Sequence, residues 1–202
     1  MVRQRPLEPP YEGSNPSSPA SAVYARVTCQ RKMKTIFLTG KPRSGKSYLI
    51  NEIVERLQEK GLKVGGILTP DIRENNERTG FNIIDIYTGA KEILASKHRK
   101  EGPTLGKYRI NVEGINIVTN RFSENLEKFD IIVIDELGVM ELKSAMFKEM
   151  LDQILKIPKL KLIVLNQHLV KFHVSEGELV EMKRENAEEI KENILRKIAT
   201  DN

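Results

Sequence analysis

Residues 36–47 read IFLTGKPRSGKS, an apolar run followed by a glycine-bounded loop that ends in Lys46 and Ser47. From Gly40 onward the loop has the pattern G-x-x-x-x-G-K-[S/T], and apolar residues at helical spacing follow it. Such a loop between a strand and a helix turns successive backbone N–H groups toward one point, and the helix N-terminus adds partial positive charge there. The stretch therefore predicts a strand, a polyphosphate-binding loop and a helix, in that order.

The side chains at the end of this loop have the chemistry that a nucleotide requires. We expect the Lys46 ammonium to neutralise charge on the β- and γ-phosphates and the Ser47 hydroxyl to ligate Mg²⁺. The backbone amides of residues 43–48 are expected to donate to phosphate oxygens. The nucleotide-binding residues predicted in this segment are Gly40, Lys41, Pro42, Arg43, Ser44, Gly45, Lys46, Ser47 and Tyr48.

A second motif, the acidic pair Asp135-Glu136, follows the unbroken apolar run at 131–134. Ligands of open α/β sheets bind at the carboxyl ends of strands, and acidic side chains buried there need a cation or hydrogen-bond donors. This is a Walker B arrangement, in which Asp135 and Ser47 hold the metal and Glu136 orients and deprotonates the attacking water. The predicted catalytic residues are thus Lys46, Asp135 and Glu136. The nucleotide-binding residues predicted from this strand are Ile132, Val133, Ile134, Asp135, Glu136, Leu137 and Gly138.

Strand and helix patterns alternate from Met33 to Asn202, which predicts a mostly parallel central sheet. Together with the phosphate-binding loop, this leads us to expect a P-loop NTPase fold with three α/β/α layers. The predicted parallel strands are 35–39, 63–68, 131–134, 160–165 and 179–182. Four helices are predicted. The first follows the loop, the second carries Ile115, Val118, Phe122 and Leu126, the third spans 144–157, and the last closes the chain with Ile190, Ile194, Leu195 and Ile198. Between residues 81 and 112 the alternation breaks. There 81–87 and 92–96 predict a hairpin, and 108–112 a further strand, in a small antiparallel β insertion.

Residues 1–32 contain five of the nine prolines and no periodic apolar pattern, so we predict a disordered tail before one domain at 33–202. Met33 stands directly before the first strand, which is consistent with an upstream start codon or a cloned extension. The tail carries five Lys/Arg and two Asp/Glu, hence +3 of the formal net charge of +5. Basicity is therefore weak evidence for nucleic acid, and no nucleic-acid partner is expected. No signal-peptide core or membrane-spanning run is found, which predicts a cytoplasmic protein; a monomer is our working expectation.

Several further segments match one known pattern over most of residues 34–198. They are Gly65-Gly66 with Thr69 and Arg73, Arg78-x-Gly80-Phe81-x-Ile83, Gly106-Lys107-Tyr108, Val133 to Leu142, and Glu185-Asn186. With these segments the sequence resembles the cancer-related nucleoside-triphosphatases, small P-loop enzymes of thermophilic prokaryotes and animals. The resemblance implies slow Mg²⁺-dependent hydrolysis of ATP, GTP and other nucleoside triphosphates, with broad base tolerance. The sequence departs from the family at Arg43, Val139 and Ala187, where glycine, lysine and arginine are usual.

Basic side chains of the inserted region are candidates for an arginine finger supplied in cis, and the competing interpretation is a solvated basic rim. The candidates are Arg73, Arg78, Lys97, Arg99, Lys107 and Arg109. Arg73 and Arg78 are preferred for phosphate or lid contacts because they lie in the segments that match the family. Two other functions stay open: a nucleoside or nucleotide kinase with the insertion as a lid, and a nucleotide-dependent regulatory or RNA-associated switch.

Overall fold

The computed structural model of the chain describes residues 35–170 and 177–201. All of them belong to the unit Met33–Asn202. The predicted disorder of residues 1–32 concerns a segment outside the described residues, and it stays a prediction.

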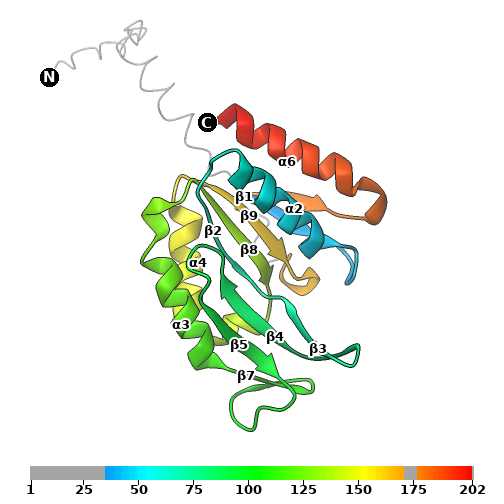
Figure 1. Cartoon of the computed structure of the whole chain (residues 1–202), viewed down its shortest axis with the longest axis vertical. Coiled ribbons are helices and arrows are strands. Elements are labelled where there is room, and N and C mark those ends of the chain that lie inside the picture. The colour runs from blue at the N-terminus through cyan, green and yellow to red at the C-terminus, as the bar shows by residue number, and fades with distance from the viewer. Residues whose placement is uncertain (1–34, 171–176, 202) are drawn as a thin grey trace, which may run out of the picture. The chain divides into compact units, whose positions relative to one another are not determined.

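The described strands form one mixed sheet in the order β10-β1-β9-β8-β2-β4-β5-β7-β6, with β3 paired to β4 (Figure 1). Its parallel half consists of β1 (Thr35–Thr39), β2 (Val64–Leu68), β8 (Ile131–Leu137), β9 (Leu160–Leu165) and β10 (Glu178–Glu181). Each of these strands lies within two residues of its predicted start. β8 lies between β2 and β9, and this central position explains its unbroken apolar run, because both of its faces are covered.

The antiparallel half extends the same sheet and is larger than the sequence predicts. It consists of β3 (Asp71–Glu74), β4 (Glu77–Asp85), β5 (Lys91–Ser96), β6 (Thr104–Leu105) and β7 (Tyr108–Ile110). The hairpin of β4 with β5 confirms the predicted one, but β4 begins earlier because it also pairs with β3. The turn between β3 and β4 is made by Asn75 and Asn76, with φ of 49° and 64°, a conformation that asparagine tolerates. The last predicted strand is shorter than expected because Val112 begins the next helix.

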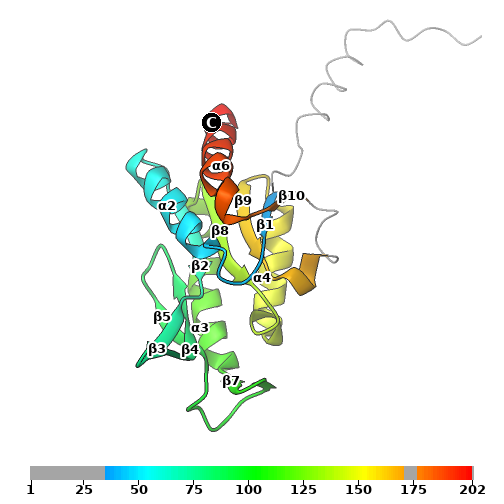
Figure 2. The same ribbon diagram turned by 90° about the vertical axis from the view of Figure 1, so that its right-hand side faces the viewer.

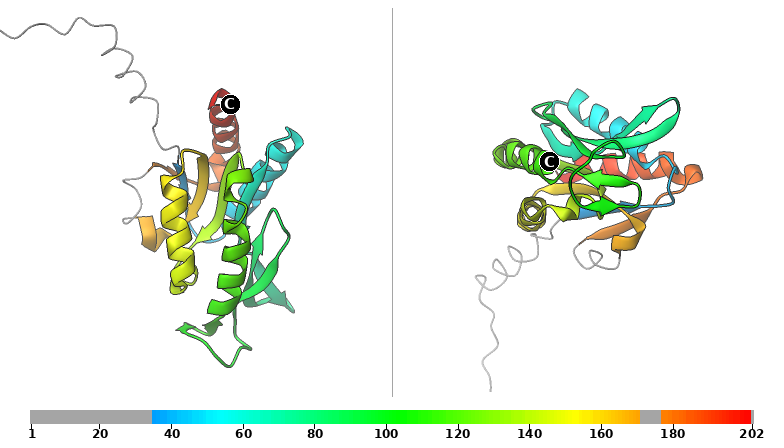
Figure 3. Two further views of the ribbon diagram at one scale, coloured as in Figure 1. Left: turned by 90° about the vertical axis from the view of Figure 1, so that its left-hand side faces the viewer. Right: turned by 90° about the horizontal axis from the view of Figure 1, so that it is seen from below.

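Helices cover both faces of the sheet and complete the predicted three layers (Figures 2 and 3). One face carries α2 (Lys46–Glu59) and α6 (Ala187–Asp201), and the other carries α3 (Val112–Ser123) and α4 (Ala145–Lys156). The two faces have separate apolar cores, whose central residues include Ile50 and Ile53 on one side and Phe122 and Phe147 on the other. Leu126, predicted on a helix face, is buried in a short 3-10 turn, η1 (Leu126–Lys128).

The pairing of β8 with β9 is irregular at the carboxyl end of β8. Ile134 pairs with Ile163 and Leu137 with Leu165, so β8 contains one extra residue over this interval. An extra residue in one strand breaks the alternation of side chains between the two faces and redirects them locally. Asp135 and Glu136 lie inside this irregular interval, which takes them out of the regular pattern of the strand. The peptide bond between these two residues is cis.

No helix within the described ranges combines the length and the apolar character that crossing a membrane requires.

Candidate active site

The glycine-rich loop connects β1 to α2 at the carboxyl end of β1. Gly40 and Gly45 have φ of 153° and 99°, values that side-chain-bearing residues rarely adopt. A Cβ atom on Gly40 would also lie 2.4 Å from the carbonyl oxygen of Met182, which follows β10. Conformation and space therefore both require glycine at position 40. The backbone N–H of Leu49 donates to the Gly45 carbonyl at 3.0 Å and begins the helical bonding of α2.

The Lys46 ammonium lies against the loop itself. Its Nζ donates to the carbonyl oxygens of Gly40 at 2.9 Å and Lys41 at 3.0 Å. Inside the same loop the hydroxyl of Ser44 is buried and has no hydrogen-bond partner among the described residues. Buried polar atoms are normally paired, so an unpaired hydroxyl in a loop that also carries Lys46 fits a loop that binds an anion.

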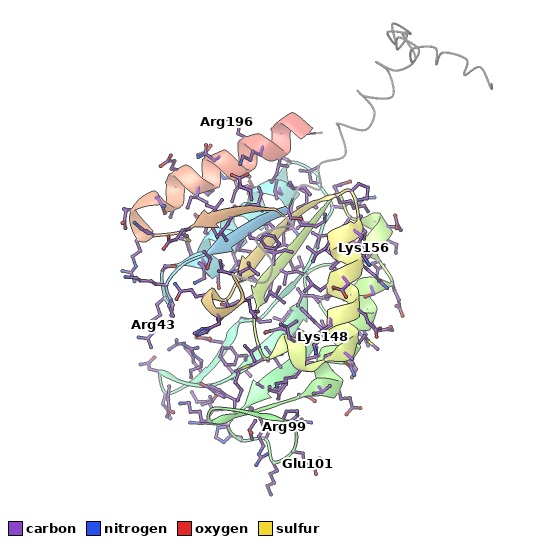
Figure 4. All side chains as sticks on the ribbon, turned by 180° about the vertical axis from the view of Figure 1, so that it is seen from behind. Arg43, Arg99, Glu101, Lys148, Lys156 and Arg196 are labelled. Carbon is purple, nitrogen blue, oxygen red and sulfur yellow. The ribbon has the colours of Figure 1, made fainter. Side chains whose placement is uncertain are left out.

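Arg43 has a left-handed backbone with φ of 63°. A non-glycine residue in this conformation is strained, so a glycine would be accommodated at this position at lower cost. Its side chain is exposed and points outward from the loop (Figure 4). The Arg43 carbonyl oxygen accepts from the Arg184 guanidinium at 3.4 Å. Arg184, which follows β10, therefore contacts the backbone of the loop.

Asp135 and Ser47 come together as the sequence predicts for a metal site. Asp135 is 6% exposed, and burial raises the pKa of its carboxyl to about 6, although a hydrogen bond from Ser47 opposes the shift. Its Oδ1 is buried without a hydrogen-bond partner in the described part of the chain. An unpaired carboxylate oxygen beside a hydroxyl is the donor set that Mg²⁺ takes in nucleotide sites. The residues present therefore fit the metal.

A magnesium ion here would rely on few protein ligands. Across the described ranges, no group of three or more His, Cys, Asp or Glu side chains could hold a metal ion. Mg²⁺ usually keeps several waters and binds through one or two protein groups together with substrate phosphates. The pair Ser47 and Asp135 is sufficient for a site of that kind.

Glu136 is held from both neighbouring strands. On the β2 side, its backbone N–H donates to the hydroxyl of Thr69 at 2.9 Å, and the same hydroxyl donates to the Asp135 carbonyl at 3.0 Å. On the β9 side, the Asn166 amide donates to Oε1 of the Glu136 carboxylate at 2.8 Å. Neither neighbour was predicted from the sequence to have a role. Thr69 lies in a family-matching segment, whereas no sequence signal distinguishes Asn166.

Glu141 is a further acidic group near the site, and no role was predicted for it from the sequence. It is 4% exposed at the start of η2 (Glu141–Lys143), and its carboxylate accepts from the Gly138 N–H at 3.0 Å. Burial and, to a smaller extent, the charges of Glu136 and Asp135 raise its pKa to about 8, although hydrogen bonds to the backbone oppose the shift. At neutral pH this carboxyl is therefore predominantly protonated.

Four residues predicted to bind nucleotide have side chains enclosed in the apolar cores. They are Ile132, Val133, Ile134 and Leu137, all with 0% exposure. Their side chains support β8 instead of facing a ligand. Gly138 follows β8 and donates to Glu141, whereas Tyr48 is 70% exposed in the first turn of α2.

Arg73 and Arg78, the preferred lid candidates, are both engaged by one carboxylate on the β3–β4 hairpin. Asp71 Oδ2 lies 2.9 Å from Arg73 Nη2 and 3.3 Å from Arg78 Nε. Other candidate cations also have partners within the insertion: Lys97 and Lys107 both pair with Glu77. Figure 4 shows Arg99 beside Glu101 at the lower end of the molecule, in the inserted region.

The sheet order, the loop between β1 and α2, and the acidic residues at the end of β8 define this chain as a P-loop protein of the α/β class. Residues 35–195 match the family described as NTPase, and the chain belongs to that family.

Named relatives agree with this assignment. The chain is 41% identical over 165 residues to nucleoside-triphosphatase THEP1 of Methanocaldococcus jannaschii, covering 81% of this chain and 96% of the relative. It is 35% identical over 164 residues to nucleoside-triphosphatase THEP1 of Pyrococcus abyssi, covering 80% of this chain and 90% of the relative.

Two solved structures have the same fold. The crystal structure of THEP1 from Aquifex aeolicus matches with a TM-score of 0.70 and 30% identity, covering 81% of this chain and 98% of that one. The solution structure of a human cancer-related nucleoside triphosphatase also gives a TM-score of 0.70, covering 84% of this chain and 99% of that one. At 24% identity, this second likeness concerns the fold alone.

Proposed function

We propose that this protein is a Mg²⁺-dependent nucleoside-triphosphatase that hydrolyses ATP, GTP and other nucleoside triphosphates to the diphosphate and phosphate. The observation that carries the proposal is the arrangement at the end of β8. There Asp135, with an unpaired buried oxygen, lies beside Ser47 of the loop, and Glu136 is held on both sides. The printed name nucleoside-triphosphatase of the archaeal relatives supports the same activity.

Each residue has a separate task in this mechanism. Lys46 and the loop amides bind the β- and γ-phosphate oxygens, replacing the carbonyl partners that Lys46 has at Gly40 and Lys41. Ser47 and Asp135 would hold Mg²⁺, which when bound would neutralise charge on the phosphate oxygens. Glu136 accepts a proton from the attacking water as the new P–O bond forms, and the bond to the β-phosphate oxygen breaks to release the diphosphate.

Arg73 and Arg78 are the proposed phosphate or lid contacts from the insertion. Asp71, which holds both, begins β3 only two residues after Thr69, the residue that contacts Glu136. This proximity along the chain supports a role near the γ-phosphate. Either arginine would have to exchange Asp71 for phosphate.

The test is the substitution Glu136→Gln, which preserves shape but removes the proton acceptor. Loss of general-base catalysis predicts a fall in kcat of about 10²- to 10⁴-fold, measured as phosphate release from ATP, GTP, CTP and UTP with Mg²⁺. Nucleotide affinity should stay within a few fold, because the carboxylate acts mainly in the transition state. Glu127→Gln is the matched control. Glu127 is exposed and lies before the start of β8, whereas Glu136 lies near its end, so this variant should hydrolyse nucleotide as the wild type does.

The same assay, repeated with a panel of nucleoside and nucleotide acceptors, separates hydrolysis from phosphoryl transfer. Normal hydrolysis by Glu136→Gln, together with phosphorylation of an added nucleoside by the wild type, would replace this proposal with a kinase.

A further inference from the structure

The side chain of Asn166 has a fixed orientation. Asn166 directly follows β9 and is the N-cap of η3 (Gln167–Leu169), where its Oδ1 accepts from the His168 N–H at 3.2 Å. Because the amide oxygen is used by this cap, the amide nitrogen must point the other way. That nitrogen donates to Glu136 Oε1 at 2.8 Å. Turning the amide over would break both bonds.

The backbone of Asn166 is fixed as well. Its N–H donates to the Leu137 carbonyl at 3.1 Å, which continues the pairing of β9 with β8 beyond the irregular interval. Its carbonyl accepts from Leu169 at 2.9 Å within η3. The donor that reaches Glu136 is therefore built on a strand end and a capped turn, both of which limit its movement.

The two oxygens of the Glu136 carboxylate differ in their surroundings. Oε1 accepts from Asn166, whereas the described residues make no hydrogen bond to Oε2. A hydrogen bond from a neutral amide to a carboxylate restricts rotation of the carboxylate and is stronger than one between neutral groups. One oxygen is thus committed to orientation, and the other is free to accept a proton.

We propose that Asn166 is a positioning residue for hydrolysis, and that its amide holds the Glu136 carboxylate so that Oε2 receives the proton from water. The inference rests on the proposed function, in which Glu136 is the general base. Asn166 touches neither water nor nucleotide in this role and acts only through Glu136.

The first test is Asn166→Asp. Aspartate keeps the shape and caps a turn as well as asparagine, but it replaces the donor with a second acceptor. Loss of an orienting partner of this kind costs about 10- to 100-fold, here in kcat, while KM and nucleotide affinity stay within a few fold. Asn125→Asp is the matched control. Asn125 also precedes a 3-10 turn, η1, but this turn lies before the start of β8, at the other end of the strand from Glu136. The Asn125→Asp variant should hydrolyse nucleotide as the wild type does.

Asn166→Ser covers the outcome in which Asn166→Asp does not fold. Serine also caps turns but has no amide to reach the carboxylate, so the same loss in kcat is expected. Folding of each variant is checked by circular dichroism and thermal unfolding. Wild-type kcat in a folded Asn166→Ser or Asn166→Asp variant would overturn the inference.

The decisive measurement is a double-mutant cycle with Glu136→Gln, followed by single-turnover phosphate release. If Asn166 acts only through the Glu136 carboxylate, Asn166→Ser should cost less than about threefold in the Glu136→Gln background. Multiplicative losses would mean that Asn166 acts independently, and would refute the positioning role. Normal hydrolysis by Glu136→Gln alone would instead refute the proposed function, so the two failures are distinguishable.

Discussion

The buried carboxyl of Glu141 should make the stability of this protein decrease with rising pH. Its pKa is about 8 in the folded protein against 4.5 for a solvent-exposed glutamate, chiefly because of burial. Between these two values the folded state binds a proton that the unfolded state has lost, so the free energy of unfolding falls as pH rises through the interval. The contribution of this protonated carboxyl to the free energy of unfolding is fully present below pH 4.5 and is lost by about pH 8, a change of about 5 kcal/mol.

Glu141→Gln removes this titration and keeps an oxygen that can accept from the Gly138 N–H. We expect the variant to match the wild type near pH 5 and to exceed its stability by as much as about 5 kcal/mol near pH 9. The measurement is urea unfolding followed by circular dichroism between pH 5 and 9, with EDTA and without nucleotide. A smaller slope should remain in the variant up to about pH 6, because burial also raises the pKa of Asp135.

Glu127→Gln serves as the control, since Glu127 is exposed and the substitution should leave the pH dependence unchanged. Parallel stability curves for the wild type and Glu141→Gln across the whole range would refute the reasoning. Such a result would mean that Glu141 ionises freely in the folded protein despite its burial.

Substitutions at two further positions test the loop and the metal site. Arg43→Gly should relieve the left-handed strain and stabilise the protein by about 0.5–1 kcal/mol, measured by urea unfolding, whereas Arg43→Ala keeps the strain and should not stabilise it. Equal stability of the two Arg43 variants would contradict the strain. Asp135→Asn should abolish the gain in nucleotide affinity that Mg²⁺ provides while leaving affinity in EDTA within a few fold, measured with a fluorescent nucleotide analogue. A Mg²⁺ response of wild-type size in Asp135→Asn would remove this residue from the metal site.

Most helices and strands follow from local patterns. The aliphatic residues of α2 all fall on one buried face, and Ser144 caps α4 by accepting from the Phe147 N–H. β3 is one exception, because DIRE is a short, polar stretch with no alternation toward a core. The pair Asn75-Asn76 does indicate a turn in the sequence. However, an isolated two-stranded hairpin is marginally stable, and β3 forms by pairing with β4, which is itself part of the larger sheet.

The sequence by itself determined the chemistry of the protein: a glycine loop ending in Lys46 and Ser47, and an acidic pair after an apolar strand. These motifs are short and contiguous, so their conformations follow from local backbone preferences and from the ends of single elements. The tertiary structure alone decided which groups surround them. Asn166 reaches Glu136 across 30 positions of sequence, and Thr69 across 67, because β9 and β2 flank β8 in the sheet. Strand order depends on packing over the whole domain, which no local periodicity encodes.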